Sequence, residues 1–415
     1  MTYYVDSVNG KPENSGKTMD LPLDTYLNIK VKPGDTILFK AGSVFRTDLF
    51  SPDGKENAVI TWGMYGEGAK PTFLLSQNVK NASDWKEVDK NIWFYTSPLH
   101  SEACNLIFNY GDSCGVMVWE YGDMKEQGQW YSKPQKKGEP CTLYMYSEKN
   151  PAEIYTDIEC AVKRNGPVTS GAKYVRFENL YFLNVGSHVY AAENAKCVSI
   201  VNCDFKYIGG RIWDRKQRIR FGNAIEIWEY GEDVLIDRCT FDEIYDSATT
   251  HQGFINKKPC LRINITNNVF KNHGMAAFEL RDLVAVDSHF DNNICIGAGL
   301  GFSLQGEISP RKSELWPQPM GHHLFIWRIP KMSPGGSTTV HNNVFYEAPY
   351  GALIYSTALP DAESQIDFDN NVYYKTEDDY LIRLGGKNYG KADFERYKKE
   401  QNQDKSSRVE DIYKK

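Results

Sequence analysis

A short pattern that recurs along the chain constrains its fold more than any other feature. Each copy has an apolar residue, a polar pair rich in Asn or Asp, and a closing apolar or aromatic residue. Phe182 and Phe205 close two copies 23 positions apart, and Phe241 and Phe270 close two copies 29 positions apart. A period of this length, interrupted by insertions, is typical of a β-solenoid whose coils stack about 4.8 Å apart. The copies occupy residues 177–182, 201–205, 236–241, 265–270, 290–296, 340–345 and 368–373.

Further strand-like stretches lie between these copies, so each coil offers at least two short strands. They occupy residues 188–194, 223–228, 247–252, 275–280, 300–305 and 352–356. The sequence therefore predicts an all-β fold: a single-domain parallel β-helix over residues 1–385 with an N-terminal cap, and a short C-terminal capping helix or tail over 386–415. Paired Asn residues at matching turns are predicted to stack as amide ladders along the axis. They are Asn267, Asn268, Asn292, Asn293, Asn342, Asn343, Asn370 and Asn371.

Composition and charge exclude several classes of protein. The length of 415 residues alone suggests two or three domains, but the repeat favours one solenoid instead. A net charge of -6 argues against a general nucleic-acid-binding protein, which would be basic. No run approaches about 18 apolar residues, so neither a transmembrane helix nor a membrane partner is expected. No secretory signal precedes the strand at Tyr3, so we expect a cytoplasmic protein or a secreted one whose signal has been removed.

The nine cysteines are odd in number and lack the spacing of a zinc site. We therefore expect them to be mostly buried free thiols. The five from Cys197 to Cys295 fall in or next to repeated strands and are expected to lie in the core of the coils.

Four segments resemble a known group of proteins. The sequences YYVDSVNG, KPGDTILFKAGSVFR and ITWGMYGEGAKPTF are similar to the N-terminal coils of right-handed parallel β-helix carbohydrate-active enzymes. Residues 115–155 resemble a segment of β-helix glycoside hydrolases of the fucosidase/xylanase and lacto-N-biosidase kind. The resemblance spans nearly the whole chain and implies a right-handed β-helix with carbohydrate chemistry, although fold analogy alone does not fix function.

Two insertions break the period, at residues 206–221 and 306–338. The first precedes the strand-like stretch 223–228, and the second follows the stretch 300–305. Long loops in a tight solenoid are more often functional than decorative. We therefore predict that the two insertions wall a groove across one face of the solenoid.

Alternation along the strands of that face predicts which side chains point outward. Glu226 lies between Ile225 and Ile227, and Glu279 lies between Phe278 and Leu280, so both carboxylates should face solvent. In the stretch 247–252 the register is ambiguous, and one choice places His251 outward. The outward ladder is then predicted to contain Glu226, His251, Glu279 and Gln305, with Asp246 at its edge.

Clustered carboxylates suit glycoside hydrolysis, which needs one protonated acid and one ionised base or nucleophile. Glu226 and Glu279 should lie two coils apart, roughly 9 to 10 Å at the backbone, which is near the range of inverting enzymes. Asp246, one coil from each, could instead form a closer retaining pair. The predicted catalytic residues are Glu226, Asp246, Glu279 and His251, the histidine either binding a substrate hydroxyl or tuning a carboxylate.

The substrate-binding residues are predicted from the insertions and from the same face. Basic residues at 206–220 outnumber Asp214 and suggest an anionic sugar. Indole rings in or beside the insertions could stack on sugar rings. No cofactor is expected: the pair His322 and His323 is too isolated for a metal site, and no loop has calcium-ligand spacing. The predicted binding residues are Trp213, Arg218, Arg220, Trp228, Arg281, Gln305, Trp316 and Trp327.

The chain is thus predicted to be a glycoside hydrolase that acts on an oligo- or polysaccharide in a groove. The first alternative is a polysaccharide lyase. Lyases of the alginate-lyase-like β-helix kind carry a Lys and an Arg on adjacent strands, whereas the matching strands here hold only Arg281. The second alternative is a non-catalytic glycan-binding solenoid. In each case the partner is a carbohydrate, and the sequence leaves the oligomeric state open.

Overall fold

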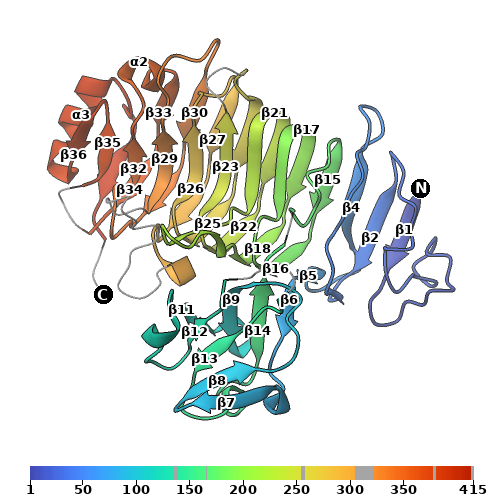
Figure 1. Ribbon diagram of the computed structural model, residues 1–415. Coiled ribbons are helices and arrows are strands. Elements are labelled where there is room, and N and C mark those ends of the chain that lie inside the picture. Colours follow the sequence, from blue (N-terminus) through green and yellow to red (C-terminus); the bar gives the residue numbers. More distant parts are fainter. Residues whose placement is uncertain (135–138, 165, 254–257, 304–320, 377–379, 413–415) are drawn as a thin grey trace.

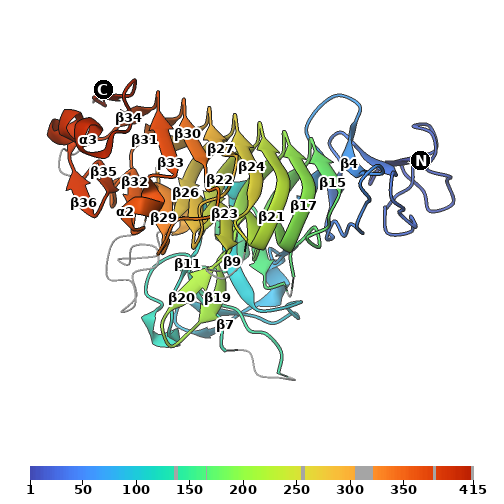
Figure 2. The same cartoon turned by 90° about the horizontal axis from the view of Figure 1, so that it is seen from above.

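The computed structural model describes residues 1–134, 139–164, 166–253, 258–303, 321–376 and 380–412. Its main body is a stack of coils that runs between the two ends of the chain, with a smaller lobe on one side (Figures 1 and 2). Strands of successive coils pair in parallel, for example Glu226 with Thr250 and Thr250 with Glu279. The predicted all-β parallel β-helix is therefore confirmed.

The coils present three faces. The first face continues from the N-terminal halves of two long strands, β17 (Tyr190–Val201) and β21 (Ile225–Asp237). Glu229 and Asp233 have φ angles of 66° and 58°, where β21 turns the corner from the first to the second face. The first face then contains β23 (Ser247–Gly253), β26 (Ala276–Arg281), β29 (His322–Trp327), β32 (Ile354–Ser356), β35 (Ile382–Leu384) and β36 (Lys387–Tyr389).

The second and third faces complete each coil. The second face continues from β21 through β24 (Leu261–Thr266), β27 (Ser288–Asp291), β30 (Thr338–His341) and β33 (Ile366–Asp369). Toward the N-terminus the same sheet contains β1 (Thr2–Val5), β2 (Thr36–Lys40), β4 (Ile60–Tyr65) and β15 (Val175–Glu178). The third face contains β3 (Val44–Phe45), β5 (Thr72–Leu74), β16 (Tyr181–Val185), β18 (Asp204–Ile208), β22 (Thr240–Ile244), β25 (Val269–His273), β28 (Ile294–Ile296), β31 (Val344–Tyr346), β34 (Val372–Tyr374) and β37 (Arg408–Glu410).

Stacked rings and stacked amides fill the interior at the third face. Phe205, Phe241 and Phe270 lie in register, with centroids 4.7 and 4.8 Å apart and nearly parallel planes. The predicted amide ladder is confirmed for the inner Asn of each pair. Asn343, for example, accepts from the amide of Asn293 at 3.2 Å and donates to Asn371 at 3.1 Å. The outer Asn residues have positive φ, as a tight turn requires.

The cysteines follow the core only in part. All nine are free thiols. Cys203, Cys239, Cys260 and Cys295 are buried in the solenoid core, as expected. Cys197 is half-buried and has a φ of 49°, so its expected place in the core is wrong.

In the predicted strand over 300–305, residues 300–303 do not form a strand of the first face, and residues 304 and 305 lie outside the described residues. Gly297, Gly299 and Gly301 have φ angles of 70°, 74° and 76°, which a strand does not tolerate, and residues Gly301–Ser303 form a short 3-10 helix. The strand beside β26 is β29 instead. This corrects the predicted insertion at 306–338, because its residues 322–327 are part of the solenoid and its first part, 306–320, lies outside the described residues.

A lobe that the repeat did not reveal occupies residues 76–162. It contains α1 (Pro151–Ile154) and two sheets around a hydrophobic core of its own, which includes Phe108 and Trp130. The first sheet consists of β6 (Ser76–Asn78), β9 (Ala103–Phe108), β10 (Ser113–Cys114) and β14 (Ile158–Val162). The second consists of β7 (Trp85–Asp89), β8 (Ile92–Tyr95), β11 (Val116–Met117), β12 (Gln129–Tyr131) and β13 (Tyr144–Tyr146).

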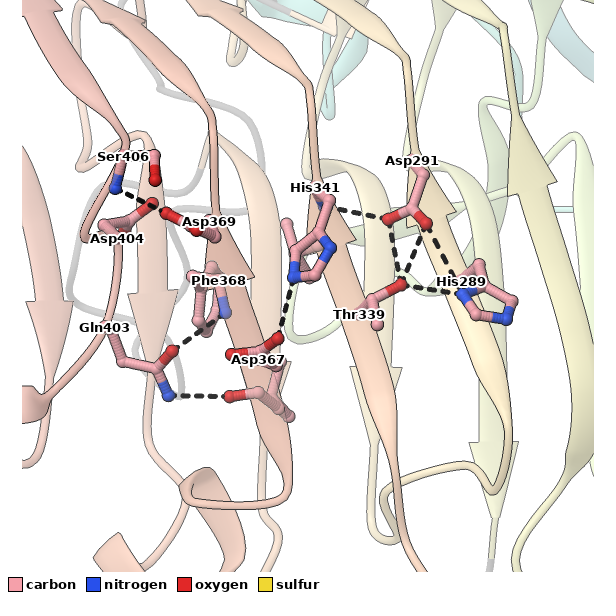
Figure 3. Close-up of polar contacts among 12 residues, drawn as sticks. His289, Asp291, Thr339, His341, Asp367, Phe368, Asp369, Gln403, Asp404 and Ser406 are labelled. Atoms are coloured by element: carbon pink, nitrogen blue, oxygen red, sulfur yellow. Dashed lines mark hydrogen bonds and ion pairs between the residues drawn. The ribbon is translucent and has the colours of Figure 1, made fainter.

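The C-terminal coil is closed by the segment that follows it. β36, α2 (Pro360–Glu363) and α3 (Phe394–Gln401) lie at this end (Figure 1). Gln403 bonds the main chain of β33 on both sides, accepting from Phe368 and donating to Ile366, at 2.8 Å each (Figure 3). These bonds occupy main-chain groups that an open sheet edge would expose. The division of the chain at residue 385 stays a prediction.

Outward polar side chains on the second face pair with one another. The Thr339 hydroxyl donates to Asp291 at 2.9 Å, and His341 lies 2.8 Å from Asp367 (Figure 3). In this row the outward polar side chains of neighbouring strands bond to one another.

Glu243 anchors the glycine-rich turn that follows β28 and provides a pH-dependent prediction. Its carboxylate accepts from the amide of Phe302 at 2.7 Å, and burial raises the pKa of Glu243 to about 7. Because this value exceeds that of the unfolded chain, the contribution of Glu243 to stability is full at low pH and is lost as the pH rises through about 7. The Glu243→Gln variant should therefore lose less of its melting temperature than the parent between about pH 4.5 and 7, the interval between the ordinary and the raised pKa. The exposed Glu67→Gln variant is the control, and an equal loss in parent and Glu243→Gln would contradict the assignment.

Candidate active site

A cavity of about 580 Å³ opens on the first face of the solenoid. Its floor is formed by side chains of β17, β21, β23, β26 and β29. One wall is a hairpin of β19 (Arg211–Asp214) and β20 (Ile219–Phe221), which Figure 2 shows beside the lobe. The first predicted insertion, 206–221, thus contains a hairpin that borders a cavity. The second insertion contributes Trp327 of β29.

One row of outward side chains crosses the floor at a single register. Glu226, Thr250, Glu279 and Phe325 occupy equivalent positions on β21, β23, β26 and β29. Their neighbours Ile225, Ile227, Phe278 and Leu280 lie in the solenoid core. Both glutamates line the cavity, in the orientation that the alternation predicts. At about 4.8 Å per strand, Glu226 and Glu279 are about 9.6 Å apart at the backbone.

The predicted outward place of His251 is wrong. His251 pairs in register with Ile227 and Leu280, faces inward, and packs its ring 5.4 Å from that of Phe278. Burial lowers its pKa to about 4, so the ring is neutral above that pH. The outward position belongs to Thr250, and the ambiguous run of small and polar residues in β23 explains the one-residue error.

Glu279 is nearly fully buried beneath the cavity and accepts hydrogen bonds from two hydroxyl groups. Its Oε2 lies 3.1 Å from Thr250 Oγ1 and 3.4 Å from Ser247 Oγ. Hydroxyl donors favour the ionised form of a carboxyl group. These two hydroxyl donors therefore favour the ionised form of Glu279.

Glu226 has a different environment. Its Oε2 lies 3.1 Å from Nδ1 of His188, which burial keeps neutral by lowering the histidine pKa to about 4. The side-chain amide of Asn223 lies 3.5 Å from the same oxygen. Asp246, at the start of β23, completes the carboxylate cluster and lies 3.5 Å from the amide of Gly222.

A second outward row lies two residues further along the same strands. Trp228, Gln252, Arg281 and Trp327 share a register across the same four strands and all line the cavity. Arg281 donates to Gln252 at 2.8 Å and lies over the Trp327 ring at 4.4 Å. Arg328 lies 4.9 Å from the same ring, so Trp327 holds the guanidinium groups rather than offering a clear stacking face. Trp213 and Trp228, 71% and 37% exposed, are the better sugar platforms.

The arginines of the hairpin do not point into the cavity, which corrects two predicted binding residues. Arg220 is buried, donates to the carbonyl groups of Gly210 and Cys104, and lies 4.6 Å from the Tyr245 ring. Arg215 forms an ion pair with Glu102 of the lobe at 2.8 Å. Arg218 is exposed at the hairpin tip with a φ of 55° and does not line the cavity. The basic hairpin therefore attaches the lobe to the solenoid, because its charges meet lobe acceptors.

Acidic side chains outnumber basic ones around the cavity. Among the described lining residues, four carboxyl groups face one guanidinium, that of Arg281. The carboxyl groups belong to Glu193, Glu226, Asp246 and Glu279. The argument for an anionic sugar thus loses its basis, since a uronate would be repelled here. Gln305 and Trp316, both predicted binding residues, lie outside the described residues.

Sequence reasoning missed several residues of the site. His188 and Asn223 sit just before their strands, where alternation gives no signal. Thr250 and Gln252 were not predicted because the register chosen for β23 was wrong by one residue. In the part of the chain that the structure describes, no three His, Cys, Asp or Glu side chains converge as metal ligands. The described helices are also too short or too polar to cross a bilayer.

Comparison with solved structures places the fold among β-helix enzymes. The structure of XylC in complex with xylose matches 92% of this chain and 66% of its own, with 14% identity and a TM-score of 0.58. A structure described as a glycoside hydrolase matches 92% of this chain and 95% of its own, with 9% identity and a TM-score of 0.51. The chain thus spans slightly less than two thirds of the XylC chain.

At these identities the matches show a shared fold and no more. They confirm the predicted resemblance to β-helix carbohydrate-active enzymes at the level of architecture. The pectate lyase Pel9A overlaps more loosely, with 13% identity over 93% of this chain and 73% of its own and a TM-score of 0.41. No protein-family model and no curated protein sequence matches the chain.

Proposed function

We propose that the protein is a glycoside hydrolase that cleaves a neutral glycan in the cavity of the first face. The observation that carries this proposal is the pair Glu226 and Glu279, two strands apart on one outward row, in differently constructed environments. Hydrolysis of a glycosidic bond needs two carboxyl groups in opposite protonation states. The fold shared with the xylose-bound XylC supports the choice of a small neutral sugar as the recognised unit.

In this mechanism one carboxyl group protonates the glycosidic oxygen as the bond to the anomeric carbon breaks. The second, ionised group takes a proton from a water molecule that attacks the opposite face of the sugar. The backbone spacing of about 9.6 Å leaves room for that water molecule, which favours inversion at the anomeric carbon. Arg281 lies beside Glu279, and its charge stabilises the ionised state of that carboxylate.

The experiment is a substrate screen followed by identification of the product. Purified protein is incubated with nitrophenyl glycosides and neutral oligosaccharides, beginning with xylosides and xylo-oligosaccharides. The first anomer that forms is then recorded by proton NMR. Release of a reducing sugar with inverted configuration is expected. An ultraviolet-absorbing unsaturated product would mean a lyase instead, and a retained configuration would move the nucleophile to Asp246.

A further inference from the structure

His188 is a neutral, half-buried imidazole at the edge of the cavity that sequence reasoning did not single out. It precedes β17, lines the cavity, and packs its ring 5.4 Å from that of Phe221. Its Nδ1 atom lies near the peptide amide of Asn223, the carbonyl oxygen of the same residue at 3.3 Å, and the carboxyl group of Glu226. The location of the protons on His188 and Glu226 decides whether Glu226 can act as an acid or as a base.

The shorter of the two Asn223 contacts indicates the tautomer of the histidine. The amide of Asn223 points at Nδ1 of His188 with 3.1 Å between the nitrogen atoms. A peptide N–H can only donate, so this contact favours a lone pair on Nδ1 and the ring proton on Nε2, whereas the longer contact to the carbonyl oxygen of Asn223 would favour the opposite tautomer. Burial lowers the pKa of His188 to about 4 despite the opposing field of Asp246, so the ring is not doubly protonated near neutral pH.

The same nitrogen lies 3.1 Å from Oε2 of Glu226. An ionised carboxylate would direct a lone pair at the lone pair of Nδ1, which repels at this distance. A proton on Oε2 converts that contact into an O–H donor facing a nitrogen acceptor. Glu279, in contrast, faces the hydroxyl groups of Thr250 and Ser247, which can donate to it.

We propose, on the basis of the hydrolase function above, that His188 is a positioning residue that keeps Glu226 protonated, so that Glu226 is the general acid and Glu279 the ionised base. In the reaction the Oε2–H proton moves to the glycosidic oxygen, and the electron pair of the broken C–O bond goes to that same oxygen. The O–H bonding pair stays on Glu226, and a proton from the attacking water goes to Glu279. Atoms and charge balance without another reactant.

Other charged groups surround the pair of His188 and Glu226 and must be held constant. They are Asp246 just before β23, Glu279 and Arg281 on β26, Glu193 on β17 and Arg211 on the hairpin. A change at His188 leaves all of them in place. A difference between His188 variants therefore reports the imidazole itself.

The test uses the full chain and needs no substrate. Long-range proton–nitrogen NMR of histidine-labelled protein identifies the tautomer of His188, with His188→Leu to assign its signals. Carbon NMR of glutamate-labelled protein follows the titration of Glu226, with Glu226→Gln to assign it. We expect Nε2–H imidazole and a Glu226 titration that falls by about one pH unit or more in His188→Leu. His188→Asn, which keeps an acceptor near Nδ1, should restore most of the shift.

The outcomes separate the two proposals. A proton on Nδ1, or equal Glu226 titrations in the parent and His188→Leu, overturns the role of His188 whatever the protein hydrolyses. The expected titrations without hydrolysis of any glycan would leave the histidine–glutamate pair established and reject the hydrolase. If an active nitrophenyl glycoside is found, His188→Leu should lower the upper pH limit of kcat. The variant should also lose less activity on the dinitrophenyl glycoside of the same sugar than on the nitrophenyl glycoside, because dinitrophenolate leaves with little help from an acid. Equal losses on both leaving groups overturn the role of Glu226 as acid.

Discussion

Replacing Glu279 with Gln should lower kcat by at least about 10³-fold while leaving the protein folded. Gln has the shape of Glu, and its carbonyl oxygen can still accept from Thr250 and Ser247. The substitution removes only the negative charge that would take the proton of the attacking water. The measurement is kcat on the best substrate of the screen, with circular dichroism to verify the fold.

A matched control lies on the same sheet. Glu178 of β15 points outward several strands away and pairs with Arg176, so Glu178→Gln should retain the activity of the parent. Asp246→Asn separates two versions of the mechanism. A smaller loss than for Glu279→Gln supports the two-strand pair, whereas a larger loss together with retained product configuration makes Asp246 the nucleophile. Full activity of Glu279→Gln would remove the site assignment altogether.

The largest stability effect is expected at Asn343 in the middle of the amide ladder. Its side chain donates to the carbonyl of Phe290 at 2.8 Å and accepts from the peptide amide of Asn293 at 2.8 Å. Asn343→Ala leaves both main-chain groups buried without these partners, at about 1–3 kcal/mol each. The loss should total roughly 3 to 5 kcal/mol and lower the melting temperature of the solenoid by several degrees.

Calorimetry of Asn343→Ala checks this prediction, with the exposed Asn57→Ala as control. Asn57→Ala should stay within about 0.5 kcal/mol of the parent. A similar change in both variants would mean that the ladder contributes no more than a surface amide.

The sequence predicted what its period encodes. The repeated Asn residues and closing aromatic rings lie at equivalent positions of successive coils, so their spacing was sufficient to predict the coils, the ladder and the inward ring stack. Alternation was sufficient for Glu226 and Glu279, because bulky aliphatic or aromatic neighbours flank both and specify a core side. These are the positions where burial of a large side chain dominates the choice of register.

The errors arise where that signal is weak. In β23 the residues Ser247 to Gln252 are all small or polar, and each is buried, so neither face is hydrophobic enough to fix the register and His251 was reversed. The strand beside β26 was predicted at residues 300–305 instead of at β29. Three glycines near the predicted strand have positive φ angles, which a pattern of apolar residues does not reveal. The sequence did not predict the lobe, because its short and mostly antiparallel strands do not repeat at a regular spacing. The charge of the hairpin was noted correctly, but its partners lie about a hundred residues away, at Glu102 and Cys104.

The way in which the lobe joins the solenoid bears on how such a chain could have arisen. β4 pairs directly with β15 and β5 with β16, as though residues 75–174 were an ordinary connection within a coil, and β6 and β14 run side by side where the chain enters and leaves. Closing so long a loop costs only about 1.4 kcal/mol more than closing a coil of some 23 residues, because the entropy grows with the logarithm of length. A lobe with its own core easily offsets that amount. The solenoid can therefore gain, lose or exchange a whole lobe at this connection without a change in the pairing of its coils. Each such change would reshape the cavity beside the connection.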